Sequence, residues 1–224
     1  GGSTSHTVYG GCLTYSPVDE GHTMTNCQNF GKLTISTKAG IPGNADRKGA
    51  DCFVGGFAYN TSTSEKTHTY VNCHNHGDIE LAPEAEISGA IRLGGMFGNI
   101  EDKTAMLTLD GCSNTGDITI SGKCSLGESS NCIIAGCISS CTSSGGTLVI
   151  KNGLTNKGNI TVDGENTRNY VSIGGVFGAT GSGVTFDISG NVVNTGKLTF
   201  SGKSNTYIRM GGIVSVHSAK TLNA

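Results

Sequence analysis

The sequence has no tryptophan, only 3 prolines and few charged residues, which make up 14% of the chain. Its apolar residues come in short runs, and none approaches the roughly 18 residues that a membrane-spanning helix needs. The 15 basic residues are scattered among 17 acidic ones, so no cluster of Lys or Arg is present that would neutralise a run of phosphates. We therefore expect no membrane span and no nucleic-acid partner.

Glycine, by contrast, is abundant, with 36 residues in a chain of 224. Abundant glycine with so little proline is unlike collagen or a disordered segment, and it favours many tight, regular turns. The length allows one large domain or two small ones. An internal repeat favours a single domain over residues 1–224, because it recurs along the whole chain.

The repeat is marked by the pattern Asn-x-Gly-x-Ile/Leu, which recurs at intervals of about 40 residues, as in solenoid proteins. The matches are Asn29-Phe30-Gly31-Lys32-Leu33, Asn75-His76-Gly77-Asp78-Ile79, Asn114-Thr115-Gly116-Asp117-Ile118, Asn156-Lys157-Gly158-Asn159-Ile160 and Asn194-Thr195-Gly196-Lys197-Leu198. A Gly-Gly pair with apolar flanks lies between them, at Gly10-Gly11, Gly55-Gly56, Gly94-Gly95, Gly174-Gly175 and Gly211-Gly212, with Ala135-Gly136 in the remaining place.

Each repeat contains short runs of strand-forming residues. In the fourth repeat they are Ile160 with Val162, residues 171–177 and residues 184–188. We therefore predict an all-β fold with almost no helix: a right-handed, single-stranded parallel β-helix (β-solenoid) of about five coils of roughly 40 residues, with three short strands in each coil.

Positions within the repeat have consistent chemistry. After the landmark Gly, aliphatic residues alternate with Thr and Ser, as in Ile118-Thr119-Ile120-Ser121, which predicts aliphatic side chains inside and hydroxyls outside. The landmark Asn residues are expected to stack as a ladder of amides. Asn and Gly three residues before them predict sharp corners, at Asn26, Asn72, Gly111, Gly153 and Asn191.

Length varies between repeats in two places, and we expect variable loops there. One follows the alternating strand, at residues 38–50, 83–90 and 123–131, and the other follows Gly-Gly, at residues 60–66 and 139–146. Such loops are where a rigid solenoid presents binding residues.

The 9 cysteines predict buried thiols rather than a disulfide framework. Most fall at inward repeat positions, where in-register parallel strands give a poor geometry for a disulfide bond. These are Cys27, Cys52, Cys73, Cys112, Cys132 and Cys137. Cys124 and Cys141 are expected in variable loops, and for these two residues a disulfide bond is an alternative to free thiols. The cysteine spacing matches no zinc motif, and we expect neither a metal nor a cofactor.

Asp78 and Asp117 are the best candidates for a catalytic pair, because both follow the landmark Gly and should stack on adjacent coils. Glycoside-cleaving enzymes use such paired carboxylates. The same column also contains Lys32, Asn159 and Lys197, which favours an ordinary solvated face. The chain is therefore expected not to be an enzyme, with a carbohydrate-active enzyme as the alternative.

Three further sets of polar residues are candidate sites. His68, His74 and His76 lie close in sequence, but a metal site is not favoured. Arg92 and Arg209, with Tyr170 and Tyr207, precede Gly-Gly pairs and are candidates for a sugar- or peptide-binding surface, although the two arginines are several coils apart. An outward Thr column, interrupted by Glu80, is similar to ice-binding arrays, but Thr is also a common strand residue. Its members are Thr34, Thr119, Thr161 and Thr199.

The segments 94–98 and 111–118 together resemble the GLUG-type repeat of bacterial surface proteins, and residues 174–178 and 191–198 repeat the likeness. The resemblance covers nearly the whole chain, but Ala135 replaces a glycine and the first two coils lack the glycine after Leu13 and Phe57. It implies a β-solenoid of a secreted or surface-anchored, adhesin-like protein.

These observations predict a non-catalytic extracellular binding or spacer domain that presents loops to a host or matrix protein or glycan. No helix is predicted at either end to cover the exposed strand edges. We therefore expect the chain to be part of a longer protein, with an end-to-end contact to another domain.

Overall fold

The computed structural model describes residues 8–11, 21–36, 38–39, 51–61, 67–82, 86–87, 89–100, 106–121, 131–141, 146–166, 170–204, 206–218 and 221–223. Every regular element in these ranges is a β-strand, and every strand pair is parallel. The strands stack as a β-solenoid, which confirms the predicted all-β fold and the absence of helix in this part of the chain. No helix able to cross a membrane is found among these residues.

One pass of the chain contributes strands to four sheets in turn, and we call one such pass a layer. Sheet I contains β1 (Val8–Gly11), β6 (Cys52–Gly55), β12 (Ile91–Gly94), β16 (Cys132–Ala135), β21 (Val171–Gly174) and β27 (Ile208–Gly211). Sheet II follows, with β7 (Ala58–Thr61), β13 (Phe97–Ile100), β17 (Ile138–Cys141), β22 (Phe177–Thr180) and β28 (Val214–Val216).

Sheet III is the longest and turns a corner within each layer. Before the corner this sheet contains β2 (His22–Thr25), β8 (Thr67–Val71), β23 (Thr185–Ile188) and β29 (Thr221–Asn223). After the corner it contains β3 (Gln28–Asn29), β9 (His74–Asn75) and β24 (Val192–Asn194). Two longer strands, β14 (Met106–Asn114) and β18 (Thr147–Asn156), continue across the corner. Sheet IV contains β4 (Leu33–Ile35), β10 (Ile79–Leu81), β15 (Ile118–Ser121), β19 (Ile160–Asp163) and β25 (Leu198–Phe200). Two short pairs, β5 (Lys38–Ala39) with β11 (Glu86–Ile87) and β20 (Glu165–Asn166) with β26 (Lys203–Ser204), lie between sheets IV and I.

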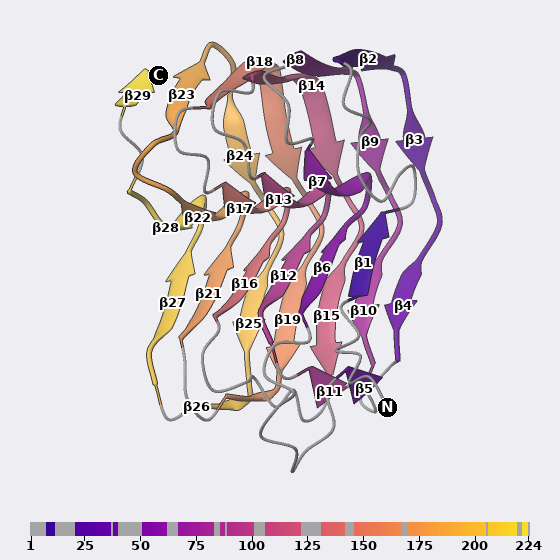
Figure 1. Ribbon diagram of the computed structural model, residues 1–224, viewed down its shortest axis with the longest axis vertical. Coiled ribbons are helices and arrows are strands. Elements are labelled where there is room, and N and C mark those ends of the chain that lie inside the picture. The colour runs from indigo at the N-terminus through magenta and orange to yellow at the C-terminus, as the bar shows by residue number, and fades with distance from the viewer. Residues whose placement is uncertain are drawn as a thin grey trace, which may run out of the picture.

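The layers stack along one direction. In Figure 1 the colour passes from indigo on the right to yellow on the left within each sheet, so neighbouring strands come from successive layers. Residues at the same repeat position are paired, as Ile91 is with Cys52 on one side and Cys132 on the other. A single side-chain choice is therefore repeated as a column along the solenoid.

The predicted three strands per coil and the number of five coils are not confirmed. Residues 171–177 were expected to form one strand, but the chain forms two, β21 and β22, with a break at Gly175 and Val176. The strands on either side of this break belong to different sheets. Apolar residues flank the Gly-Gly pair on both sides, and this continuous pattern hides the corner.

Several predicted loops begin or end as strands. Residues 60 and 61 belong to β7, residues 139–141 to β17, and residues 38–39 and 86–87 form the small pair of β5 with β11. Cys141 is therefore a buried strand residue rather than a loop residue. The rest of these predicted loops, with Cys124, lies mostly outside the described residues.

The interior contains two apolar cores. One is built from sheets I and IV and includes Ile91, Leu93, Ile118 and Ile120, all at most 1% exposed. The other is built from sheets II and III, where the ring of Phe97 packs edge-on against Tyr70 at a centroid distance of 5.0 Å. Burial of such side chains contributes about 25 cal/mol for each Å² of apolar surface removed from water. These cores are the main source of the solenoid's stability.

The landmark asparagines form a continuous ladder between the cores. The Nδ2 of Asn29 donates to Oδ1 of Asn75 at 2.6 Å, and the bonds from Asn75 to Asn114, Asn114 to Asn156 and Asn156 to Asn194 are 2.7, 2.9 and 2.8 Å long. Each Nδ2 also donates to the carbonyl of the landmark Gly two residues later. The predicted amide ladder is confirmed.

The glycines allow this close approach. A Cβ on Gly56 would collide with the side chain of Asn75 and with the carbonyl oxygen of Gly95. The predicted corners are confirmed at Asn26, Asn72, Gly111 and Gly153, which have φ angles of 57°, 50°, 63° and 102°. Asn191 has no such angle.

Candidate functional site

Tyr170, Tyr207 and Arg209 lie on or just before two neighbouring strands of sheet I, and we call them the tyrosine patch. Tyr170 directly precedes β21 and Tyr207 directly precedes β27, and the register of these strands places the two tyrosines in adjacent layers. The backbone N–H of Val171 donates to the carbonyl of Tyr207 at 3.1 Å. The Cζ of Arg209 lies 4.3 Å from the centre of the Tyr170 ring, which is a cation–π contact.

The patch combines fixed and exposed groups. The hydroxyl of Tyr170 accepts a hydrogen bond of 2.6 Å from Nδ2 of Asn131, so this ring is held in place from the preceding layer. The side chain of Tyr207 is 76% exposed, and that of Arg209 is exposed as well. Tyr207 and Arg209 are two residues apart in the chain, and together an exposed ring and an exposed guanidinium offer a flat apolar face and several N–H donors. Sugars and peptides both present groups that match this combination.

Arg92 lies elsewhere, as its sequence position predicted. It is in β12, with its Cζ 4.7 Å from the centre of the Phe53 ring in the preceding layer. Arg92 and Arg209 therefore stack on different aromatic rings and do not share a site. The sequence placed these arginines and tyrosines on the outer surface, but only the strand register assigns Arg209 to Tyr170.

Asp78 and Asp117 lie on adjacent layers, as predicted, and both make structural hydrogen bonds. The Oδ1 of Asp78 accepts from the backbone N–H of Asp117 at 2.9 Å, and Oδ1 of Asp117 accepts from that of Asn159 at 2.7 Å. The side chain of Asn159 continues the series to the N–H of Lys197. Each carboxylate thus fixes the backbone of the next layer. A catalytic role for this pair stays a prediction.

The histidines divide between the inside and the outside. His68 is fully buried, with its Nδ1 3.0 Å from Nδ1 of His22, whose Nε2 is 3.2 Å from the Tyr70 hydroxyl. His74 is on the outer face, bonded to Ser113 and Asn72. Burial lowers the pKa of His22 and of His74. His68 is thus not on the face of His74.

Among the described residues, no group of three or more His, Cys, Asp or Glu is placed to hold a metal ion. His76 is beside His74, with a ring-centroid separation of 6.2 Å, but its Nδ1 is bonded to the Thr115 hydroxyl. The ring of Phe30, which is 71% exposed, stacks on His76 at 4.6 Å. This contact was not foreseen, because its partners are in different layers.

The outward Thr column is present as a regular row. Thr119 pairs with Glu80 on one side and with Thr161 on the other, and Thr34 and Thr199 extend the row at its two ends. Glu80 interrupts it and forms a 2.6 Å ion pair with Lys32. The hydrogen bond to Glu80 raises the pKa of Lys32. Ice binding by this row stays a prediction.

The cysteines at inward positions are thiols that the core shields. Cys73, Cys112 and Cys137 are buried free thiols, and Cys27 is a half-buried one. Burial raises the pKa of Cys112 to about 11, and it also raises that of Cys137 and of Cys73. Thiols that stay protonated are poor nucleophiles and poor metal ligands. These three cysteines therefore act as small core residues.

The fold and the tyrosine patch together define a class: a parallel β-solenoid with an exposed aromatic and cationic patch on one outer face. In comparisons with known proteins, no family model, no curated protein and no solved structure matches the chain. The GLUG-type resemblance therefore stays an expectation from the sequence.

Proposed function

We propose that this chain is a non-catalytic extracellular binding domain of an adhesin-like bacterial surface protein. The GLUG-type resemblance supports the class and the location, secreted or on the cell surface. The continuous asparagine ladder supports a stiff scaffold, because buried amide bonds link successive layers. We take the scaffold to be right-handed, as connections between parallel strands usually are, with about five coils as the repeat predicts.

The ligand class that the tyrosine patch fits best is a glycan. The exposed ring of Tyr207 offers a stacking surface for the apolar face of a sugar ring, and Arg209 offers donors to hydroxyl or carboxylate oxygens. Tyr170 is already engaged by Asn131 and Arg209, so it orients the guanidinium. The carrying observation is the stacking of Arg209 on Tyr170, with the exposed Tyr207 two residues before Arg209 in the chain.

A glycan array with the purified domain tests this proposal. We expect binding to a subset of glycans, and we expect Tyr207→Ala and Arg209→Ala to weaken it at least tenfold, about 1.4 kcal/mol in free energy. Phe30→Ala is the matched control, because it also removes an exposed aromatic ring, but from the first layers of the solenoid. Binding that Tyr207→Ala leaves unchanged, or no binding to any glycan, would contradict the proposal.

A further inference from the structure

Ser113, His74 and Asn72 form a chain of hydrogen bonds across two neighbouring layers. Ser113 is in β14 and His74 is in β9, and the strand register pairs the two residues directly. The Oγ of Ser113 is 2.8 Å from Nδ1 of His74, and Nε2 of the same ring is 2.7 Å from Oδ1 of Asn72. A hydroxyl, an imidazole and a carboxamide in this order have the connectivity of the nucleophile, base and orienting group of acyl-transfer sites.

The direction of these hydrogen bonds is fixed by a fourth residue. Nδ2 of Asn72 donates to Oδ1 of Asn26 at 2.7 Å, so the carboxamide of Asn72 turns its oxygen toward His74. That oxygen can only accept, so Nε2 of His74 carries the proton of their hydrogen bond. Nδ1 is then unprotonated in the neutral ring and accepts from the Ser113 hydroxyl. The chain thus selects the tautomer that can take a proton from Ser113.

The charge and the exposure of these side chains suit the same role. Burial and the neighbouring His76 lower the pKa of His74 below its ordinary value of 6.5. At pH 7 the ring is therefore mostly neutral, with the lone pair of Nδ1 available to a proton. Ser113 and His74 are half-buried, so a small molecule can reach the hydroxyl from solvent.

The neighbouring pair of Thr115 and His76 has a similar distance but a different proton arrangement. Nδ1 of His76 is 2.7 Å from Oγ1 of Thr115, and this hydroxyl donates to the carbonyl of Asn75 at 3.4 Å. Because the Thr115 proton is directed to the backbone, Nδ1 of His76 is the donor in the contact with Thr115. His76 is therefore not placed to act as a base toward this hydroxyl, and the pair is an internal control.

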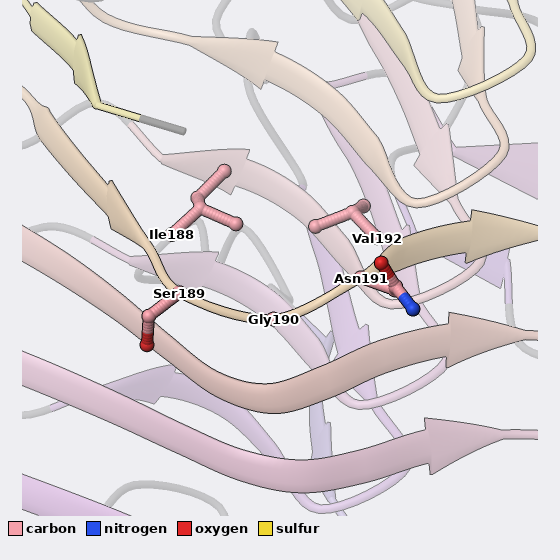
Figure 2. Close-up of a pocket in the computed structure, with 5 residues that line it drawn as sticks. All are labelled: Ile188, Ser189, Gly190, Asn191 and Val192. Atoms are coloured by element: carbon pink, nitrogen blue, oxygen red, sulfur yellow. The ribbon is translucent and has the colours of Figure 1, made fainter.

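Two other serines donate to backbone carbonyls instead of a base. Ser139 donates to Ile133 at 2.7 Å, and Ser189 donates to Ile150 at 3.3 Å. Figure 2 shows Ser189 in the segment of residues 188–192, which lines a hollow at the corner between β23 and β24 and has no ionisable side chain. A serine hydroxyl without a base is a weak nucleophile. The pairing with His74 therefore distinguishes Ser113 from these serines.

The backbone around Ser113 limits which acyl donors can react. The N–H of Ser113 donates to the carbonyl of Cys73 at 3.1 Å, and that of Thr115 donates to the carbonyl of Asn75 at 2.8 Å. These groups are thus not available to form an oxyanion hole, and each missing donor slows acyl transfer by a factor of about 100 to 1000. The acyl donor must therefore have a leaving group that departs easily, as a phenolate does. The serine ester that forms has a poor leaving group, so the acyl group stays on the protein.

We propose that Ser113 is a covalent acceptor site for the acyl group of activated esters, with His74 as the general base and Asn72 as the residue that orients it. The Oγ of Ser113 attacks the carbonyl carbon of the ester, and its proton passes to Nδ1 of His74. The bond from that carbon to the leaving oxygen then breaks, the proton moves from Nδ1 to the leaving oxygen, and the acyl group remains on Oγ. No further reactant is consumed. The site does not involve the tyrosine patch, so this proposal and glycan binding can fail separately.

Reaction of the whole chain with p-nitrophenyl acetate tests the proposal. Release of p-nitrophenolate gives the rate, and peptide mass mapping locates the acetyl group. We expect Ser113 to be acetylated at least about tenfold faster than Ser121, a half-buried serine at the end of β15. His74→Gln should slow acetylation of Ser113 at least about tenfold, because the base is lost. His76→Gln is the matched control and should change this rate by less than about twofold, because His76 does not contact Ser113.

Variants at Asn72 test the orienting role. Asn72 has a φ of 50°, and Gly111 has a φ of 63° at the corner of the next layer, so Asn72→Gly should keep the corner while it removes the carboxamide. We expect Asn72→Gly to slow acetylation of Ser113 at least about tenfold, and Asn72→Asp, which keeps an acceptor for Nε2, to restore the rate. Four results would overturn the proposal: no acetyl group on Ser113, acetylation of Ser121 or Thr115 as fast as that of Ser113, an unchanged rate in His74→Gln, or equal rates in the two Asn72 variants.

Discussion

The carboxamides of Asn75 and Asn114 are hydrogen bonded across neighbouring layers, with Nδ2 of Asn75 donating to Oδ1 of Asn114 at 2.7 Å. Both side chains are fully buried. Each carboxamide in the ladder is both donor and acceptor, so removing one leaves two neighbours incomplete. Buried polar groups that lose a partner cost more than an exposed hydrogen bond contributes.

The Asn114→Ala variant should therefore be strongly destabilised. It removes the acceptor of Asn75 and the donor to Asn156, and each buried group left unpaired costs about 1 to 3 kcal/mol, so we expect a loss of about 3 kcal/mol. Urea denaturation measures the free energy of unfolding. Asn191→Ala is the matched control, because that side chain is exposed at a corner and should change stability by less than about 0.5 kcal/mol. Equal losses in the two variants would contradict a stabilising ladder.

The landmark glycines should tolerate no side chain. In Gly116→Ala the new methyl group would collide with the carbonyl of Gly77, so the layers must move apart, at a cost of about 2 kcal/mol or more. Gly212→Ala is the control, because a Cβ there meets nothing within 4 Å. Thermal unfolding should show a lower midpoint for Gly116→Ala and a nearly unchanged one for Gly212→Ala. If the two variants unfold at the same temperature, close packing between layers is not the reason that glycine recurs at the landmark position.

The recurrence of one pattern is what made this fold predictable from the sequence. A period of about 40 residues places equivalent residues in one column of a solenoid, and the ladder, the corners and the buried cysteines all follow from that. The corner between β21 and β22 did not follow, because Val176 and Phe177 continue the apolar run across it. A local pattern therefore located the strands better than the breaks between them.

Side-chain contacts between layers were also not predictable from the sequence. Arg209 and Tyr170 are far apart in the chain, and only the register of β21 with β27 brings them together. The same is true of Phe30 with His76 and of His22 with Tyr70. In contrast, Asp78 and Asp117 were placed correctly by the landmark itself. Their hydrogen bonds to backbone groups could not be read from residue types alone.

The buried thiols should resist modification while the protein is folded. Burial raises the pKa of Cys112 to about 11 and also raises that of Cys137, so little thiolate is present at pH 8 and reagents cannot reach the sulfur. Alkylation with iodoacetamide, followed by peptide mass mapping, should label both only after urea is added. The half-buried Cys27 is the internal control and should be labelled first. Labelling of Cys112 as fast as Cys27 would show that the core opens readily.

The first layers should lose stability in mild acid because of His22. Burial lowers the pKa of this side chain in the folded state, so between that value and about 6.5 the unfolded chain binds the proton more readily. Its contribution to stability is therefore complete above about pH 6.5 and falls as the pH drops through the window below it. Protonation of His22 would also place a charge 3.0 Å from the buried His68.

Urea denaturation at pH 7.5 and at pH 5.5 measures this effect. The free energy of unfolding should drop between the two pH values, and the drop should be smaller in His22→Gln than in the unmodified chain. His74→Gln, on the outer face, tests whether the second histidine with a lowered pKa accounts for the remainder. A drop in His22→Gln as large as that of the unmodified chain would assign the acid sensitivity to other groups.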